Sequence, residues 1–281
     1  LFPSPYLRLA GLSIGNPVGD FTGVFLQVER LNAKLNLVAL MTGRLVFSEA
    51  HLYQPVIQLE IDTAGNQNWQ FPQNHLDKEA GIRSLLFTQQ LKVTDARLEY
   101  VNRITGEQRM GEIHHFQLEV PVGRTVSSVE AFASYRSVPI RVTGSLGDMS
   151  YWANGNLEPI AIEYTAGDVS GELSGRVTET LGDGKLDLRY TARSDRLDSA
   201  GRLLGLDLGR YAAGFVAEAD IRGNWQQSSL VNAVVALSGG ESQLEAIGDF
   251  GGIVAMGDVV RLQNGWCAVR YRRLGRDTWV P

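Results

Sequence analysis

The chain has 281 residues, with 26 Lys and Arg against 31 Asp and Glu and a single cysteine. The basic residues are spread along the sequence, which argues against nucleic acid as a partner, because nucleic-acid binding requires clustered positive charge. One cysteine excludes an internal disulfide framework. No apolar run reaches the roughly 18 residues that a membrane-spanning helix needs, and the chain begins without Met. We therefore expect either a soluble protein or one whose membrane anchor is missing from this sequence.

Apolar and polar residues alternate with a period of two through most of the chain. This pattern is typical of β-strands with one buried face, because successive side chains of a strand point to opposite sides. Leu31, Ala33, Leu35 and Leu37 form the first clear run. Further runs lie at 57–61, 98–100, 116–120, 140–146, 160–164, 169–177, 186–190, 215–221 and 244–250. The spacing predicts an all-β chain of roughly a dozen strands.

Glycine-containing turns between these runs indicate hairpins. Thr105-Gly106 and Ala166-Gly167-Asp168 are examples that supply the positive φ angles of tight turns. Only two stretches have helical character, Asp77–Phe87 and Ser194–Leu206, the second with Asp195 as candidate N-cap. Both are too short to cover a sheet of this length. We therefore predict an antiparallel sheet with strands paired in sequence order, one or two short helices and an apolar face that no second layer covers.

The apparent catalytic and metal-binding motifs have unfavourable contexts. Gly11 to Gly15 matches the G-x-S-x-G pattern around Ser13, but Pro17 prevents the helix that must follow a nucleophile elbow. The adjacent His114 and His115 point to opposite faces of a strand, and the other two histidines have no ligands at metal-binding spacing. We predict a non-enzymatic protein without catalytic residues, metal or cofactor, and a hydrolase using Ser13 is a distant alternative.

Four segments in a characteristic order resemble a known family. They lie at 9–17, 31–40, 53–60 and 65–71, the last of which reads Gly-Asn-Gln-Asn-Trp-Gln-Phe. Together they are similar to the N-terminal region of AsmA-like proteins, the Gram-negative envelope family that includes AsmA, TamB and YhdP. The segments at 93–100 and 203–208 extend the resemblance, which covers about Leu7 to Phe250.

The resemblance implies a long, curled antiparallel sheet that forms an apolar groove, as in bridge-like lipid-transfer proteins. It also implies a periplasmic protein that an N-terminal helix, missing from this chain, anchors in the inner membrane. Such proteins are implicated in phospholipid transport between inner and outer membrane and in outer-membrane assembly. Phospholipid acyl chains and outer-membrane assembly proteins are thus the expected partners. In this interpretation the acyl chains cover the apolar side of the sheet.

The chain divides by this interpretation into a β-groove domain over residues 1–250 and an atypical tail over residues 251–281. In the tail the alternation fades and five arginines accompany the only cysteine. This shift in arginine density motivates the hypothesis of a fragment or reading-frame artefact, which strand pairing and good packing of the tail would contradict.

The predicted groove is lined by the apolar residues of the alternating runs. These are Leu35, Leu37, Ile57, Leu59, Ile61, Leu98, Tyr100, Phe116, Leu118, Val120, Ile140, Val142, Leu186 and Leu188. The alternative is a closed β-sandwich or β-solenoid for adhesion or glycan binding, in which the same residues form a dry core. In that case aromatic residues would stack on sugars, and the candidates are Trp69, Tyr100, Trp152, Tyr164 and Trp225.

Overall fold

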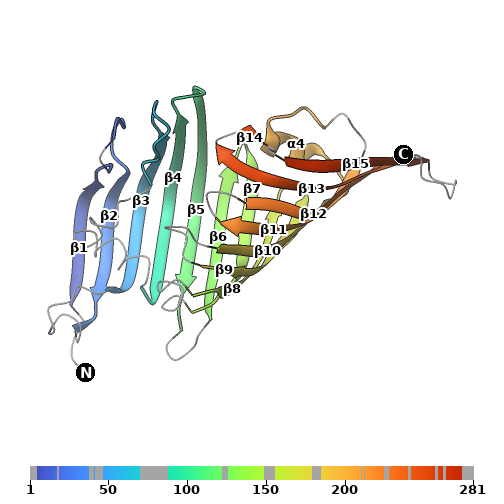
Figure 1. The fold of residues 1–281 in the computed structure, drawn as a ribbon. Coiled ribbons are helices and arrows are strands. Elements are labelled where there is room, and N and C mark those ends of the chain that lie inside the picture. The colour runs from blue at the N-terminus through green and yellow to red at the C-terminus, as the bar shows by residue number, and fades with distance from the viewer. Residues whose placement is uncertain are drawn as a thin grey trace. The chain divides into compact units, whose positions relative to one another are not determined.

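The computed structural model describes residues 5–17, 19–37, 41, 47–69, 88–121, 126–148, 156–178, 185–209, 211, 213–224, 228–239, 242–256, 259–261 and 264–273. From residue 242 onward it describes the backbone only. The chain divides into two compact units after Tyr135, and each is built on a β-sheet (Figure 1). The predicted all-β fold is confirmed. None of the helices in the described part of the chain has the length and apolar character needed to cross a membrane.

The first unit contains six strands that lie in sequence order. They are β1 (Tyr6–Ile14), β2 (Leu26–Leu35), β3 (Phe47–Ile61), β4 (Gln90–Asn102), β5 (Glu107–Glu119) and β6 (Ser127–Tyr135). Neighbouring strands are antiparallel except β3 and β4, which are parallel. The predicted antiparallel order is wrong at this one pair, since the connection between β3 and β4 is longer than the dozen residues that a crossover needs. The helix predicted at Asp77–Phe87 belongs to this connection and lies outside the described residues.

A row of irregular positions crosses the first sheet from β1 to β5. The row consists of Gly11, Glu29, Gln54, Asp95 and His114, which lie opposite one another in the registers of neighbouring strands. Three of them have positive φ angles, of 66° at Gly11, 50° at Gln54 and 54° at Asp95. His114 is an extra residue of β5 relative to β6, which makes it a β-bulge.

The burial pattern shifts by one residue where each strand crosses this row. In β2 the buried residues are Leu31 and Ala33 on one side of the row and Leu26 and Val28 on the other. A shift in one strand alone would turn its apolar side chains to the opposite face of the sheet. Because β1 to β5 shift at the same row, we infer that one face of the first sheet stays apolar along the whole length of its strands.

The second unit begins with seven strands, each antiparallel to its neighbour. They are β7 (Val138–Leu146), β8 (Glu158–Ala166), β9 (Val169–Val177), β10 (Lys185–Ser194), β11 (Gly214–Asn224), β12 (Ser228–Gly239) and β13 (Ser242–Met256). Two further strands, β14 (Val259–Arg261) and β15 (Asn264–Arg273), both pair with β13. The backbone of the predicted tail is therefore paired over much of its described part, and β13 continues across Phe250. The side-chain packing of the tail lies outside the described residues.

The helix predicted at Ser194–Leu206 is the shorter α4 (Asp198–Leu204). Its N-cap is Leu197, which makes no side-chain capping bond, so the prediction of Asp195 as N-cap is wrong. The first turn is instead fixed by a distant hairpin. The Ser199 N–H donates to Asp168 Oδ1, and the Asp168 N–H donates to Ser199 Oγ, both at 3.2 Å. These bonds tie the start of α4 to the turn between β8 and β9.

Substitution of Gln54 by valine tests the row of irregular positions. A β-branched residue is disfavoured at a positive φ, so we expect Gln54→Val to lower the free energy of unfolding by about 1–3 kcal/mol, while Gln54→Gly leaves it unchanged or raises it. Urea denaturation followed by circular dichroism measures both. Gln27→Val is the matched control, because Gln27 is exposed in β2 and has no positive φ. Equal effects of the two valine substitutions would contradict the assignment.

Candidate functional site

One side of the second sheet is apolar from β7 to β11, and we call it the second apolar face. The register places Val142 opposite Tyr164, and Leu188 opposite Ile221. The apolar residues of β7–β11 that share this face are Ile140, Val142, Leu146, Ile160, Ile162, Tyr164, Ala166, Val169, Leu173, Val177, Leu186, Leu188, Tyr190, Ala192, Phe215, Ala217, Ala219 and Ile221. Most are only half-buried, and the buried ones are Ala166, Val169, Val177, Leu186, Leu188, Ala192 and Ala219. The predicted groove residues of this unit, Ile140, Val142, Leu186 and Leu188, therefore lie together.

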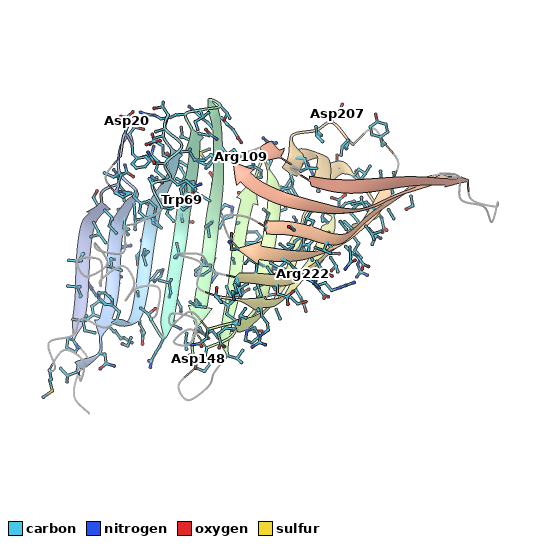
Figure 2. The ribbon with its side chains drawn as sticks, viewed as in Figure 1. Asp20, Trp69, Arg109, Asp148, Asp207 and Arg222 are labelled. Atoms are coloured by element: carbon cyan, nitrogen blue, oxygen red, sulfur yellow. The ribbon has the colours of Figure 1, made fainter. Side chains whose placement is uncertain are left out.

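The opposite side of the second sheet is charged. Arg189 Nη2 lies 2.7 Å from Glu218 Oε2, and Arg222 Nε lies 3.6 Å from Asp187 Oδ1. Arg222 is labelled among the side chains of this sheet in Figure 2. The strands of this sheet thus carry charged side chains on one face and apolar side chains on the other.

The first sheet has a corresponding first apolar face. The register joins Leu26 to Ile57 and Ile57 to Leu98, and on the other side of the irregular row it joins Leu91 to Leu118. Eight predicted groove residues share this face: Leu35, Ile57, Leu59, Ile61, Leu98, Tyr100, Phe116 and Leu118. Two predictions miss the strands: Leu37 lies beyond the end of β2, in helical conformation, and Val120 follows the end of β5. The Val120 N–H donates to the Gln89 carbonyl at 2.7 Å.

The first apolar face changes character at the hairpin between β4 and β5. Tyr100 lies opposite Arg109, and Asn102 lies opposite Glu107, so polar side chains end the apolar surface there. Burial of Tyr100 raises the pKa of its hydroxyl, which stays protonated at neutral pH. Figure 2 labels Arg109 at this end of the first sheet.

Helix α4 covers one end of the second apolar face. Ala200 and Leu203 pack against a buried cluster of Val138, Ala166, Val169 and Ala192. Further along the strands, Val177, Leu186 and Leu188 form a second cluster with Ile160, Leu173 and Ile221 around it. Within the described part of this unit, α4 is the one element that is packed on the sheet rather than paired within it.

A tyrosine pair lies beside the cluster that α4 covers. The Tyr164 hydroxyl donates to the Tyr190 hydroxyl over 2.7 Å, and the two rings are nearly parallel, with an interplanar angle of 10°. Tyr164 on β8 reaches Tyr190 on β10 across Gly171 of β9. A Cβ atom at Gly171 would lie 2.6 Å from the Tyr164 hydroxyl oxygen, and closer still to the Thr191 carbonyl oxygen. Glycine at this position therefore makes room for the pair.

A hollow of about 530 Å³ lies over the polar side of the second sheet. Thr143, Glu163, Glu172, Thr191 and Glu218 line its middle, and they share one row of the register. Arg141 and Arg193 belong to the neighbouring row. The hollow is thus on the side opposite to the apolar residues, and a groove on the apolar side stays a prediction.

A comparison with protein families identifies the N-terminal part of the chain. Residues 1–100 match the model of the AsmA family. This region is AsmA-like. The AsmA family is associated with the bacterial envelope and related to lipid transport. No curated protein and no solved structure matches the chain.

The AsmA-like region contains β1 to β3 and most of β4, so it includes the connection between β3 and β4 and four positions of the irregular row. The further resemblance, up to Phe250, stays a prediction. Ser13 lies within β1 of this region, where it is paired opposite Gln27. Its surroundings are those of a sheet residue, not of a nucleophile elbow.

A buried carboxylate fastens a loop of the AsmA-like region to the end of β3. Glu60 is fully buried, and its Oε2 accepts hydrogen bonds from the backbone N–H and the hydroxyl of Thr22, both at 2.9 Å. Its Oε1 lies 3.0 Å from Arg103 Nε, and Arg103 also binds Asp20, labelled in Figure 2. Through these contacts Glu60 holds the loop at Thr22 and the side chain of Arg103 against the end of β3.

Asn68 completes this polar cluster from the turn after β3. Its side-chain oxygen accepts from the Glu60 N–H, and its amide nitrogen donates to the Gln58 carbonyl and to Asn16 Oδ1, each at 2.8 Å. In the same turn, hydrogen bonds from the Asn66 side chain and backbone hold the pKa of Asp62 below its ordinary value. Among the described residues no group of His, Cys, Asp and Glu is arranged to hold a metal ion.

Sequence reasoning missed the apolar residues of β1 and β2 on the side of the irregular row where Leu26 lies opposite Ile57. Leu12, Ile14, Leu26 and Val28 continue the first apolar face there. The signal that could have found them is a break in the alternation, since Val28 and Leu31 are both apolar but three residues apart. The same break occurs between Val93 and Ala96.

Asn68→Ala tests the polar cluster of the AsmA-like region. The substitution leaves the buried Glu60 N–H and Gln58 carbonyl without partners, so we expect the free energy of unfolding to fall by about 2–5 kcal/mol. Urea denaturation measures the change. Asn66→Ala serves as control, because Asn66 is exposed and its side chain makes a single hydrogen bond to Asp62. A loss at Asn68 no larger than that at Asn66 would contradict this assignment.

Gly171→Ala tests the space beneath the tyrosine pair. The added methyl group collides with Tyr164 and the Thr191 backbone, so we expect a loss of about 1–3 kcal/mol in the free energy of unfolding and a changed near-ultraviolet circular dichroism of the tyrosines. Gly111→Ala is the matched control, since its Cβ would lie 3.7 Å from the nearest atom. An unchanged tyrosine signal in Gly171→Ala would show that the pair does not require this glycine.

Proposed function

We propose that the chain is a non-enzymatic, periplasmic lipid-binding module whose apolar faces hold phospholipid acyl chains. In this proposal it takes part in phospholipid transport between the inner and outer membranes and in outer-membrane assembly. A helix preceding the present sequence anchors it in the inner membrane. The AsmA-like N-terminal region, from an envelope-associated family related to lipid transport, supports the proposed setting.

The observation that carries the proposal is the second apolar face. Its residues come from five adjacent strands, most are half-buried, and α4 covers only one end of it. Water on such a surface is unfavourable, and each CH₂ group removed from water contributes about 0.8 kcal/mol. Two acyl chains on this face would therefore stabilise the sheet without any polar contact. In this proposal the lipid is both the transported ligand and part of the hydrophobic core.

The sandwich alternative requires two packed inner faces. The described strands of each unit belong to a single sheet, and the described part of neither unit contributes a second sheet against its apolar face. The glycan alternative requires exposed aromatic platforms. Tyr100 and Tyr164 lie on the apolar faces, and Trp69 is half-buried in a turn, labelled in Figure 2. Trp152 and Trp225 lie outside the described residues. No observation favours either alternative over lipid binding.

Mass spectrometry of the purified protein and one matched pair of variants test the proposal. We expect phospholipid to co-purify with the wild-type chain and to fall at least about fivefold in Val142→Asn, because burying an unpaired amide against acyl chains is costly. Thr143→Asn is the control on the opposite face of the same strand. Absence of phospholipid from the wild-type protein, or equal amounts in both variants, would contradict lipid binding at this face.

A further inference from the structure

The tyrosine pair introduces hydroxyl groups into the middle of the second apolar face, where the other polar side chains of the described strands, Glu158 and Ser194, lie at the ends. The neighbours of Tyr190 on this face are Leu173 on β9, Ala219 on β11 and Leu188 along its own strand. The charged residues that flank it in sequence, Arg189 among them, lie on the opposite face of the sheet. An uncharged polar group is thus surrounded by hydrocarbon.

The hydrogen bond within the pair has a defined direction. Burial and the hydrogen bond to Tyr190 both raise the pKa of Tyr164, as expected for a hydroxyl that donates. In the structure the Tyr164 hydroxyl donates this bond and the Tyr190 hydroxyl accepts it. A hydroxyl that accepts one bond can still donate its own hydrogen, and in the described part of the chain the Tyr190 hydrogen has no acceptor.

The tyrosine pair lies at the boundary between the part of the second apolar face that α4 covers and the part that it leaves uncovered. Tyr164 and Tyr190 pack against the cluster covered by α4, so the pair marks the limit of the helix. From Tyr190, β10 continues through Leu188 to Leu186, a distance of about 14 Å along the strand. A ligand on this stretch would have one end against the Tyr190 hydroxyl and its length over the half-buried side chains around Leu188 and Leu186, which are Ile160, Leu173 and Ile221.

We propose that the Tyr190 hydroxyl donates a hydrogen bond to an ester carbonyl of a bound diacyl phospholipid, whose acyl chains extend along β10 toward Leu186. A neutral carbonyl suits this position because none of the described β7–β11 residues on this face carries a positive charge that could balance a phosphate. Ester carbonyls are also the acceptors nearest to the acyl chains. This inference rests on the proposed lipid binding and assigns to it a recognition residue.

Binding of ester-linked and ether-linked lipids tests the assignment. The two probes are diacyl and dialkyl phosphatidylglycerol of equal chain length, and the ether form lacks the carbonyl oxygens. A neutral hydrogen bond is worth about 2- to 10-fold in affinity, so we expect the wild-type protein to prefer the ester by that factor. Tyr190→Phe should bind both lipids equally, at about the affinity of the wild-type protein for the ether.

Tyr164→Phe is the matched control, because it removes the same atom from the partner ring and leaves the Tyr190 donor in place. We expect it to keep the preference for the ester. Near-ultraviolet circular dichroism establishes that both variants retain the fold, and the comparison of the two lipids on the wild-type protein needs no variant.

The outcomes distinguish a failure of the proposed lipid binding from a failure of the role assigned to Tyr190. If the wild-type protein binds neither lipid, lipid binding itself fails. If it binds ester and ether equally, or if Tyr190→Phe keeps the preference, lipid binding stands and the role of Tyr190 is overturned. Loss of the preference in Tyr164→Phe would also overturn the assignment to the free hydrogen of Tyr190.

Discussion

The period of two in a β-strand is the constraint on which this molecule depends. A strand with one apolar side has no tolerance for a shift of a single residue, because the shift turns its apolar side chains toward water. The first unit accommodates such shifts by placing them in one row, from Gly11 through Gln54 and Asp95 to His114. Because the shifts coincide, neighbouring strands stay paired and the apolar surface stays continuous. The irregular row is therefore a feature of the whole sheet and not of one strand.

Much of this architecture follows from the sequence, since alternation is a local pattern. The strands, the hairpin at Gly106 and the shared face of Ile140, Val142, Leu186 and Leu188 were all predictable. The positions that escaped prediction depend on distant partners. Gln54 and Asp95 adopt a positive φ without the glycine that would signal it, because the neighbouring strands impose the conformation.

The other differences have the same origin. Strands β3 and β4 pair in parallel. A long connection between two strands permits parallel pairing, but its length alone does not predict it. Helix α4 begins at Asp198 because Asp168, in a hairpin some 30 residues earlier, holds Ser199. Of the candidate site, the apolar residues were predictable and the tyrosine pair was not, since it depends on Gly171 lying between two strands that are not neighbours in the sequence.

The positive φ at Gly11 has a further consequence, because β1 is paired on one side only among the described strands. An exposed, flat strand edge is a template on which other chains can add and aggregate. The positive φ of Gly11, near the middle of β1, departs from the extended conformation that such a template needs. We therefore infer that Gly11, which helps to keep the apolar face continuous, also limits self-association through the free edge of β1.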